Sequence, residues 1–194
     1  MKKIGLFFGS FNPIHIGHII LANYFTENTD LEEVWLVVSP QNPFKQKQSL
    51  LANHHRLQLV NRAVEEYPKL KVSDIEFGLP TPSYTSTTLA HLEEKYPEKD
   101  FALLIGEDNL CTFHKWKNYQ LILERHQLYV YPRVNVNEIP AEFKGHPKIK
   151  LVNAPRIELS SSDIRSAIKA GKNVRPSMPP ESWQYLDEMN FYKS

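Results

Sequence analysis

Short apolar runs alternate along the chain with segments in which apolar residues recur every three or four positions. The runs have the length of strands buried on both faces, and the recurrent segments are typical of helices that bury one face. Strands are therefore predicted at residues 3–8, 33–39, 71–77, 101–105, 127–131 and 148–152. Helices are predicted over residues 19–25, 53–64, 83–96, 166–170 and 180–189.

This alternation predicts a parallel sheet with right-handed crossovers, and hence an α/β fold with a Rossmann-like, doubly wound parallel sheet. The chain has 194 residues, which is enough for one well-buried domain and too few for two of ordinary size. We expect a single domain over residues 1–194, on which the C-terminal helical segment 160–194 packs. Ligands of such sheets bind beyond the carboxyl ends of the strands, so the segments that follow strands are the places to examine for chemistry.

Composition narrows the class of protein. A hydrophobic content of 41% with 23% charged residues is that of a globular chain, and a net charge of +1 argues against a dedicated nucleic-acid binder. We find no secretory signal and no apolar run near 18 residues, so we expect a cytoplasmic protein without a membrane partner. The single cysteine, Cys111, cannot form an internal disulfide, and its apolar neighbours predict a buried thiol. The sequence leaves the oligomeric state open, a homo-oligomer included.

The first chemical motif follows the first strand, at residues 9–18. Gly9 and Pro13 predict a sharp, stiff turn, because glycine admits unusual backbone angles and proline fixes one of its own. His15 and His18 then stand at the start of a helix, where free N–H groups and the helix dipole favour an anion. Two imidazoles there can donate to phosphate oxygens. A zinc site formed by His15, His18, His54 and His55 is less favoured, since neither clustered cysteines nor a His-Glu-x-x-His pattern accompanies these histidines.

Residues 9–18, GSFNPIHIGH, resemble the GxFxPxHxGH signature of the nucleotidyltransferase superfamily, and their spelling is most similar to that of the nicotinate-mononucleotide adenylyltransferases. The resemblance implies that the two histidines of the motif are catalytic. Asn12 stands where the family usually has an acidic residue. The residues implied to bind ATP are Gly9, Ser10, Phe11 and His18, and those implied to bind the mononucleotide are Asn12 and His15.

The loop after the second strand, Pro40 to Lys45, contains two prolines and an asparagine. It resembles the second phosphate-contacting segment of that family, and Lys45 takes the place of the basic residue that reaches the triphosphate. The resemblance therefore implies a catalytic and mononucleotide-binding role for Lys45. Asn53 is predicted to cap the next helix. Arg56 lies in its first turn, where the dipole disfavours a cation, so it is either exposed or faces an anion.

Further along, the segment from Ser83 to Leu89 also resembles these adenylyltransferases. Ser83 is predicted to cap a helix whose first N–H groups could bind an anion. Trp116 lies between two lysines that must reach water, so we expect a partly exposed ring. The resemblance implies that this ring stacks on the nicotinate and that N–H groups near Thr85 and Lys117 hold its carboxylate. The implied mononucleotide-binding residues here are Ser83, Tyr84, Thr85, Trp116 and Lys117.

The fourth and fifth strands end in polar residues. Gly106 and Asp108 follow the fourth strand, and a carboxylate at that place can accept hydrogen bonds from ribose hydroxyls. Arg133 follows the fifth strand and is a candidate for the same nucleotide. The resemblance assigns Gly106 and Asp108 to the ATP site, and we add Arg133 to it.

The last motif, Leu159 to Arg165, opens a helix that we expect to end at Gly171. It resembles the superfamily's ISSTxIR signature, with Ser162 in place of threonine and the hydroxyl kept. Serine hydroxyls, N–H groups at a helix start and an arginine fork together predict a second phosphate cradle. Ser161, Ser162 and Arg165 are therefore expected to bind ATP, and Arg165 to be catalytic.

The resemblance spans nearly the whole chain and implies adenylyl transfer from ATP to nicotinic acid mononucleotide, giving deamido-NAD and pyrophosphate. The acceptor phosphate is already ionised, so no protein nucleophile is needed and catalysis depends on positioning and charge stabilisation. Mg²⁺ is expected to arrive with ATP, because the sequence shows no carboxylate cluster for a protein-bound metal. Two alternatives stay open. One is another adenylyl- or cytidylyltransferase of the superfamily, such as the pantetheine-phosphate enzyme, and the other is a nucleotide-binding regulator without turnover.

Overall fold

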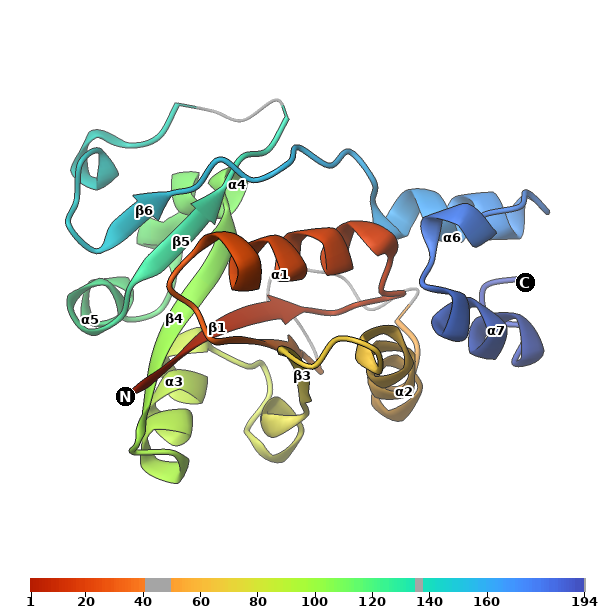
Figure 1. The fold of residues 1–194 in the computed structure, drawn as a ribbon, viewed down its shortest axis with the longest axis horizontal. Helices are drawn as coiled ribbons and strands as arrows, with labels where there is room; N and C mark the ends of the chain where they lie inside the picture. The colour runs from red at the N-terminus through yellow and green to blue at the C-terminus, as the bar shows by residue number, and fades with distance from the viewer. Residues whose placement is uncertain (41–49, 135–137, 194) are drawn as a thin grey trace.

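The computed structural model describes residues 1–40, 50–134 and 138–193. Its centre is a sheet of six strands in the order β3-β2-β1-β4-β5-β6, and every pair of neighbours is parallel (Figure 1). The predicted Rossmann-like α/β class is confirmed. The strands are β1 (Lys2–Gly9), β2 (Glu33–Val38), β3 (Leu70–Ser73), β4 (Lys99–Gly106), β5 (Leu128–Tyr131) and β6 (Ile149–Leu151).

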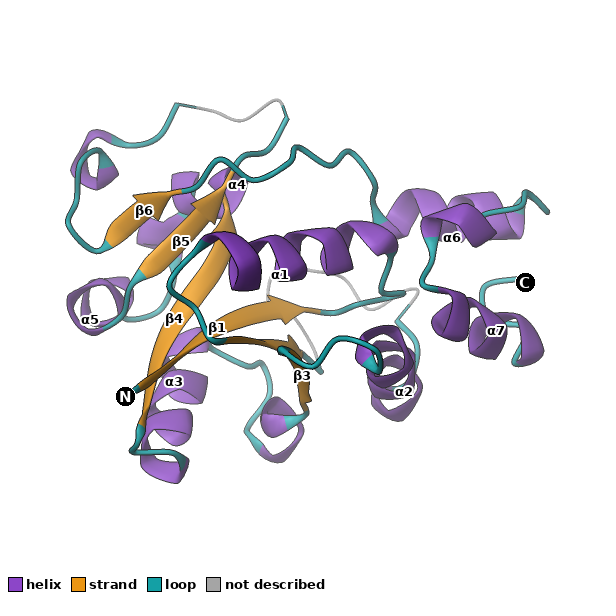
Figure 2. Cartoon of the chain, in the orientation of Figure 1, coloured by secondary structure: helices purple, strands orange, loops and turns teal. Residues whose placement is uncertain are grey.

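Helices cover both faces of this sheet (Figure 2). Alternate side chains of β4 point to opposite faces, so Leu103 packs in one apolar cluster and Leu104 in the other. Helices cover both faces of the inner strands, which explains why β1, β2, β4 and β5 are almost continuously apolar. The first face carries α1 (Ile16–Asn28), α2 (Asn53–Val64), α6 (Ser161–Lys169) and α7 (Pro180–Glu188), and the second carries α3 (Thr85–Lys95), α4 (Glu107–Cys111) and α5 (Tyr119–Arg125).

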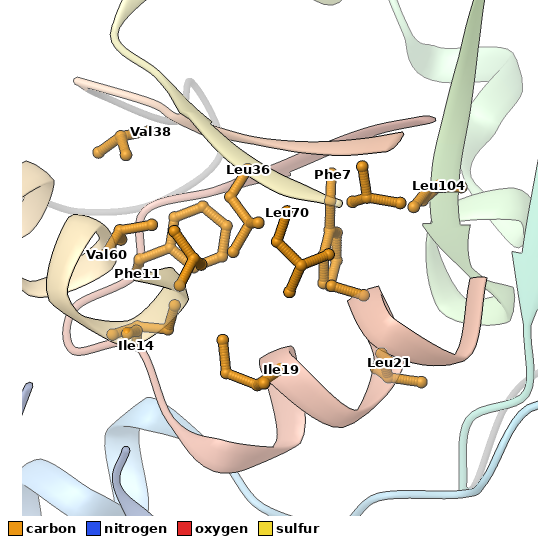
Figure 3. Close-up of a cluster of buried hydrophobic side chains, with 14 of the residues drawn as sticks. Phe7, Phe11, Ile14, Ile19, Leu21, Leu36, Val38, Val60, Leu70 and Leu104 are labelled. Atoms are coloured by element: carbon orange, nitrogen blue, oxygen red, sulfur yellow. The ribbon is translucent and has the colours of Figure 1, made fainter. Parts of the chain in front are cut away.

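The strand order reverses between β1 and β4. From β1 the chain runs outward through β2 to β3, whereas from β4 it runs outward through β5 to β6 on the other side. A crevice opens beyond the carboxyl ends of strands at such a switch point. Its floor is packed, because the loop after β1 buries Phe11 and Ile14 in the same cluster as Val60 (Figure 3).

The third strand is shorter than predicted. Strand β3 ends at Ser73, and η1 (Ile75–Gly78) is a turn of 3₁₀-helix where the sequence predicted continuing strand. The Ile75 N–H donates to the Ser73 hydroxyl at 3.4 Å, a local bond of the kind that turns a chain out of a ladder. Three further short 3₁₀ segments connect the layers: η2 (Phe113–Lys115), η3 (Ala141–Phe143) and η4 (Arg175–Ser177).

Two smaller predictions were wrong. The cap of α2 is Ala52, and Asn53 is the first helical residue, whose side chain accepts a bond from Arg56 instead. Cys111 is half-buried at the end of α4, with its Sγ 3.8 Å from the carbonyl oxygen of Glu138, and is not a core thiol. Gly171 does follow α6 with a φ of 70°, as predicted. In the ranges that the structure describes, no helix is long and apolar enough to cross a membrane.

Candidate active site

The turn after β1 needs glycine for space. The left-handed backbone angle in this turn belongs to Phe11, with a φ of 43°, and not to Gly9 as the sequence suggested. A Cβ added at Gly9 would lie 2.8 Å from the Phe11 ring, which is closer than real Cβ atoms come to a neighbour. The Phe11 side chain is almost fully enclosed and its ring centre lies 5.1 Å from that of His18. The Phe11 ring therefore packs against the His18 imidazole.

The two histidines of the motif form one unit at the start of α1. His15 is the N-cap, and its backbone N–H donates to Nδ1 of His18 at 3.2 Å. Because Nδ1 of His18 accepts this bond, the ring proton of the neutral imidazole stands on Nε2, where it can be donated to an anion. The two rings are stacked with centres 3.7 Å apart.

His15 is neutral at physiological pH. Burial, together with the positive charge of Arg133, lowers the pKa of His15 to about 4. Its Nδ1 is enclosed and has no hydrogen-bond partner among the residues that the structure describes. His15 therefore presents a neutral imidazole, which can form a hydrogen bond to phosphate without adding a full charge.

The second motif is attached directly to the first. Ser161 Oγ donates to the carbonyl oxygen of Pro13 at 2.8 Å, and Arg165 Nη1 donates to that of Asn12 at 2.7 Å. The other arm of the Arg165 fork, Nη2, reaches Ser162 Oγ at 3.2 Å. Ser160 caps α6, since its hydroxyl accepts from the Asp163 N–H at 3.1 Å. Two segments far apart in sequence thus form one wall.

Arg56 lies beneath this wall and is fully buried. It was expected to be exposed or to face an anion, and neither is the case among the described residues. Its guanidinium donates instead to the carbonyl oxygens of Ser10 at 2.6 Å, Ser39 at 2.8 Å and Leu51 at 3.0 Å. It therefore joins the loops after β1 and β2. Its spacing from the buried Leu59 and Val60 places it on the apolar face of α2, a signal that the sequence already held.

Asn12 is held from two further directions. Its side-chain Oδ1 accepts from the Leu51 N–H at 3.1 Å and from the Tyr192 hydroxyl at 2.6 Å. The residue is 4% exposed and lines the crevice. Nothing in the sequence pointed to Tyr192, which lies near the end of the chain.

The ends of β4 and β5 supply an acidic and a basic group. Arg133 Nε lies 3.6 Å from Asp108 Oδ1, and the Arg133 N–H donates to Glu107 at 3.0 Å. A Cβ at Gly106 would lie 2.3 Å from Asp108 Oδ1, so any other residue there would displace the Asp108 carboxylate from its place beside Arg133. Both side chains of the ion pair are partly exposed, which keeps them accessible to a ligand and makes the pair weak by itself.

A different set of groups lies on the far side, around the start of α3. This helix begins at Thr85 after Tyr84, so Ser83 is not its cap as predicted. The Ser83 hydroxyl is buried and has no partner within the described residues. Lys117 places its ammonium group 4.5 Å from the centre of the Tyr84 ring, and Trp116 is half-buried as predicted.

Glu76 belongs to the same side and was missed by sequence reasoning. It is 2% exposed, burial raises the pKa of its carboxyl, and Thr88 Oγ1 donates to its Oε1 at 2.7 Å. Glu76 lies in the turn η1, which the sequence did not predict, and its side chain is buried there.

Most of these groups line one crevice of about 1130 Å³. That exceeds the roughly 300–1,000 Å³ of a pocket for one small ligand, so there is space for two substrates side by side. We call the wall of the two motifs the phosphate half, and residues 76, 83–85 and 116–117 the acceptor half. The predicted site residues that line the crevice are Gly9, Ser10, Phe11, Asn12, His15, His18, Ser83, Tyr84, Thr85, Asp108, Trp116, Lys117, Arg133, Ser161, Ser162 and Arg165.

Two predicted residues are not among them. Gly106 adjoins Asp108 but does not line the crevice, and Lys45 lies outside the described residues. Within the described ranges, no three of the histidine, cysteine, aspartate and glutamate side chains are grouped closely enough to hold a metal ion. His55 of the considered zinc set lies elsewhere, 2.8 Å from the Tyr185 hydroxyl.

Known proteins resemble this chain over its whole length. A family model described as cytidylyltransferase-like matches residues 6–167. A probable nicotinate-nucleotide adenylyltransferase of Flavobacterium psychrophilum is 58% identical over 191 residues, which cover 98% of this chain and 99% of the relative. The protein of the same name from Christiangramia forsetii is 59% identical over 192 residues and 99% of both chains.

Solved structures share the fold. The nicotinic acid mononucleotide adenylyltransferase of Plasmodium falciparum, complexed with NaAD, superposes with a TM-score of 0.83 at 23% identity, over 100% of this chain and 98% of that one. A putative nicotinate-nucleotide adenylyltransferase from Vibrio parahaemolyticus gives a TM-score of 0.74 at 24% identity, over 100% of this chain and 97% of that one.

Proposed function

The chain belongs to the cytidylyltransferase-like family and, within it, to the nicotinate-nucleotide adenylyltransferases, and from this premise we propose how its residues carry out the reaction. The enzyme transfers the adenylyl group of ATP to nicotinic acid mononucleotide in NAD biosynthesis. One oxygen of the mononucleotide's 5′-phosphate attacks the α-phosphorus of ATP in line with the bond that breaks. Pyrophosphate leaves, and deamido-NAD is formed.

The observation that carries the proposal is the joining of the two motifs. Arg165 donates to the Asn12 carbonyl and Ser161 to the Pro13 carbonyl, so the second phosphate cradle stands beside the histidine turn. The start of α6 and the start of α1 thus face one crevice. Helix starts favour anions, and donors fixed in advance stabilise charge without reorganisation during the reaction.

We assign the catalytic roles within the phosphate half as follows. His18 donates a hydrogen bond from Nε2–H to a phosphate oxygen. His15, which burial keeps neutral, donates a second hydrogen bond to the phosphates from the adjacent ring. Arg165 binds the departing phosphates with the part of its fork that Asn12 and Ser162 do not occupy. Lys45 completes the set by family resemblance.

ATP occupies the phosphate half with its ribose toward Asp108 and Arg133. Gly9, Ser10, Phe11, Gly106, Ser161 and Ser162 shape or contact this side. Mg²⁺ is part of the substrate, MgATP, where it neutralises the triphosphate. The protein residues described here act on the phosphates and need not ligate the ion.

Nicotinic acid mononucleotide occupies the acceptor half, with its phosphate at Asn12 and His15. Its pyridine ring stacks on Trp116, and its carboxylate is held by N–H groups near Thr85 and Lys117, with Ser83 and Tyr84 beside it. The whole chain acts as a single domain in the cytoplasm, with residues 160–194 as part of the site. Oligomerisation is not required, since each chain carries both halves.

An acceptor panel tests this proposal. Purified protein with MgATP is offered nicotinic acid mononucleotide, nicotinamide mononucleotide and 4′-phosphopantetheine in parallel, and pyrophosphate release is measured. We expect kcat/KM to be about a hundredfold or more higher with nicotinic acid mononucleotide than with nicotinamide mononucleotide, and higher than with 4′-phosphopantetheine. Preference for phosphopantetheine would favour the sister enzyme. ATP binding without any dinucleotide product would favour a regulator.

A further inference from the structure

The end of the chain turns back toward the active site. After α7, the Phe191 N–H donates to the Leu186 carbonyl at 3.2 Å, and the backbone enters the left-handed region at Asn190 and Tyr192, with φ values of 54° and 63°. Figure 1 shows the C-terminus between α6 and α7. Left-handed angles are unfavourable for residues other than glycine and persist where surrounding contacts enforce them.

The contact that Tyr192 makes is with the histidine turn. Its hydroxyl donates to Asn12 Oδ1 at 2.6 Å, beside the bond of 3.1 Å from the Leu51 N–H. Asn12 also accepts Arg165 Nη1 at its backbone carbonyl, at 2.7 Å. The residue is therefore held by side chain and main chain from three separate parts of the sequence, and the C-terminal tail is one of them.

The hydroxyl is suited to donate. Burial raises the pKa of Tyr192, and the nearby positive charges of Arg165 and Arg56 oppose but do not cancel this shift. The side chain of Tyr192 is thus a neutral phenol at physiological pH, and its hydroxyl donates a hydrogen bond to Asn12 Oδ1. With Oδ1 facing these two donors, the amide nitrogen of Asn12 is directed to the opposite side, so the orientation of the side chain is defined.

We propose that Tyr192 is a positioning residue for adenylyl transfer. Its bond to Asn12 fixes the conformation of the turn that carries His15 and His18, and the backbone carbonyl of Asn12 in this turn accepts the hydrogen bond from Arg165. The inference rests on the proposed function. The Tyr192 hydroxyl needs an acceptor at this position, and the amide oxygen of Asn12 supplies it.

The test compares two substitutions of the same chemistry. Tyr192→Phe removes the hydroxyl bound to Asn12, whereas Tyr185→Phe removes a hydroxyl bound to His55 on α2, outside the crevice. Both lose one hydrogen bond, so both should lower the melting temperature by a similar few degrees. Only Tyr192→Phe should impair catalysis. We expect kcat to fall about tenfold with the KM for ATP changed less than about threefold, because misplacement acts on the transition state more than on binding.

A double-mutant cycle shows whether the effect passes through Asn12. In an Asn12→Ala background, Tyr192→Phe should change kcat less than about twofold, since the acceptor is already gone. Equal kcat values for Tyr192→Phe and Tyr185→Phe would overturn the inference. So would a tenfold loss that persists in the Asn12→Ala background.

Failure of the proposed function is recognised separately, as a wild type that yields no dinucleotide with any mononucleotide. ATP titration by calorimetry then decides the role of Tyr192. We expect the Kd for ATP to rise about twofold in Tyr192→Phe, within the limit set above for KM, and to stay unchanged in Tyr185→Phe. Identical Kd values in the two variants would overturn the positioning role.

Discussion

The phosphate half and the acceptor half of the crevice differ in how their polar groups are hydrogen-bonded. In the phosphate half, backbone carbonyls and side chains are bound to one another, as in the bonds from Arg165 to Asn12 and from Ser161 to Pro13. In the acceptor half, the buried Ser83 hydroxyl and Oε2 of Glu76 have no partner at hydrogen-bond distance within the described residues. The histidine turn of the phosphate half leaves one buried ring nitrogen in the same state, Nδ1 of His15, beside its many internal bonds.

This difference indicates a division of labour. Phosphate is the same in every nucleoside triphosphate, so a cradle for it can be fully assembled in advance, which favours rate. Selection between similar acceptors needs buried polar groups that the right ligand satisfies and the wrong one leaves unpaired. We therefore expect changes in the phosphate half to lower kcat for every acceptor, and loss of a buried polar group of the acceptor half, such as the Ser83 hydroxyl, to alter the preference among acceptors.

The largest effect is expected at the histidines. His18→Ala removes a donor to the reacting phosphates and should lower kcat by about a hundredfold or more, with little change in melting temperature. His15→Ala should behave alike. His54→Ala, an exposed residue on α2, is the control and should keep its activity. A His18→Ala enzyme with near-wild-type kcat would remove the histidines from the mechanism.

A smaller loss is expected from Arg165→Lys. The arginine fork binds Asn12 and Ser162 with two different nitrogens, and a lysine ammonium cannot reproduce that planar geometry. We expect kcat/KM for ATP to fall about thirtyfold in the lysine variant and further in Arg165→Ala. Arg175→Lys, on an exposed 3₁₀ turn, is the matched control. Activity restored by lysine would mean that a point charge suffices.

The two halves should also respond to pH with opposite sign. The pKa of His15 is lowered from 6.5 to about 4 in the folded protein. As pH falls through this range, His15 binds a proton in the unfolded chain but not in the folded one, so the free energy of unfolding decreases. Between pH 7 and 5 this amounts to about 2 kcal/mol. The pKa of Glu76 is raised, so its contribution is complete below its unfolded value and is lost as pH rises through the folded one.

Urea unfolding at pH 5, 6 and 7 separates these contributions. Compared with wild type, His15→Gln should lose less stability on acidification, and Glu76→Gln should lose more. Identical pH slopes in all three proteins would show that neither group is shifted as the geometry indicates.

Trp116→Ala is expected to have a milder effect, confined to one substrate. Loss of a stacking surface costs about 1–3 kcal/mol per ring, so the KM for the mononucleotide should rise about tenfold while that for ATP stays within twofold. Equal increases in both KM values would place Trp116 outside the acceptor half.

Local patterns in the sequence were enough to predict the sheet and the residues around the crevice. Apolar runs located all six strands, and glycine, proline, histidine and serine at their ends marked the turns. These signals are local, since backbone angles and capping depend on residues a few positions apart. The prediction for β3 was wrong because the Ser73 hydroxyl competes with the ladder.

The long-range contacts of the site could not be predicted from local patterns in the sequence. Arg56 donates to three carbonyls from two loops, and Tyr192 reaches Asn12 across nearly the whole chain. The partners of these two residues are neither neighbours in sequence nor regularly spaced from them, so no rule of sequence spacing predicts the contacts. Ser83 was misassigned for a related reason: a serine before a helix is usually a cap, and only the observed start at Thr85 shows that its hydroxyl is left for another role.

The most direct test of the division between the halves is the ratio of kcat/KM for nicotinic acid mononucleotide to that for nicotinamide mononucleotide, measured in wild type, Arg165→Lys and Lys117→Ala. A carboxylate can accept two N–H bonds, whereas a carboxamide must turn its NH₂ toward a donor, so we predict a wild-type ratio of about a hundredfold or more. The ratio should stay within twofold in Arg165→Lys, although its rates fall, and in Lys117→Ala, because backbone groups make the selection. A wild-type ratio near one, or a ratio that collapses in Arg165→Lys, would contradict the account.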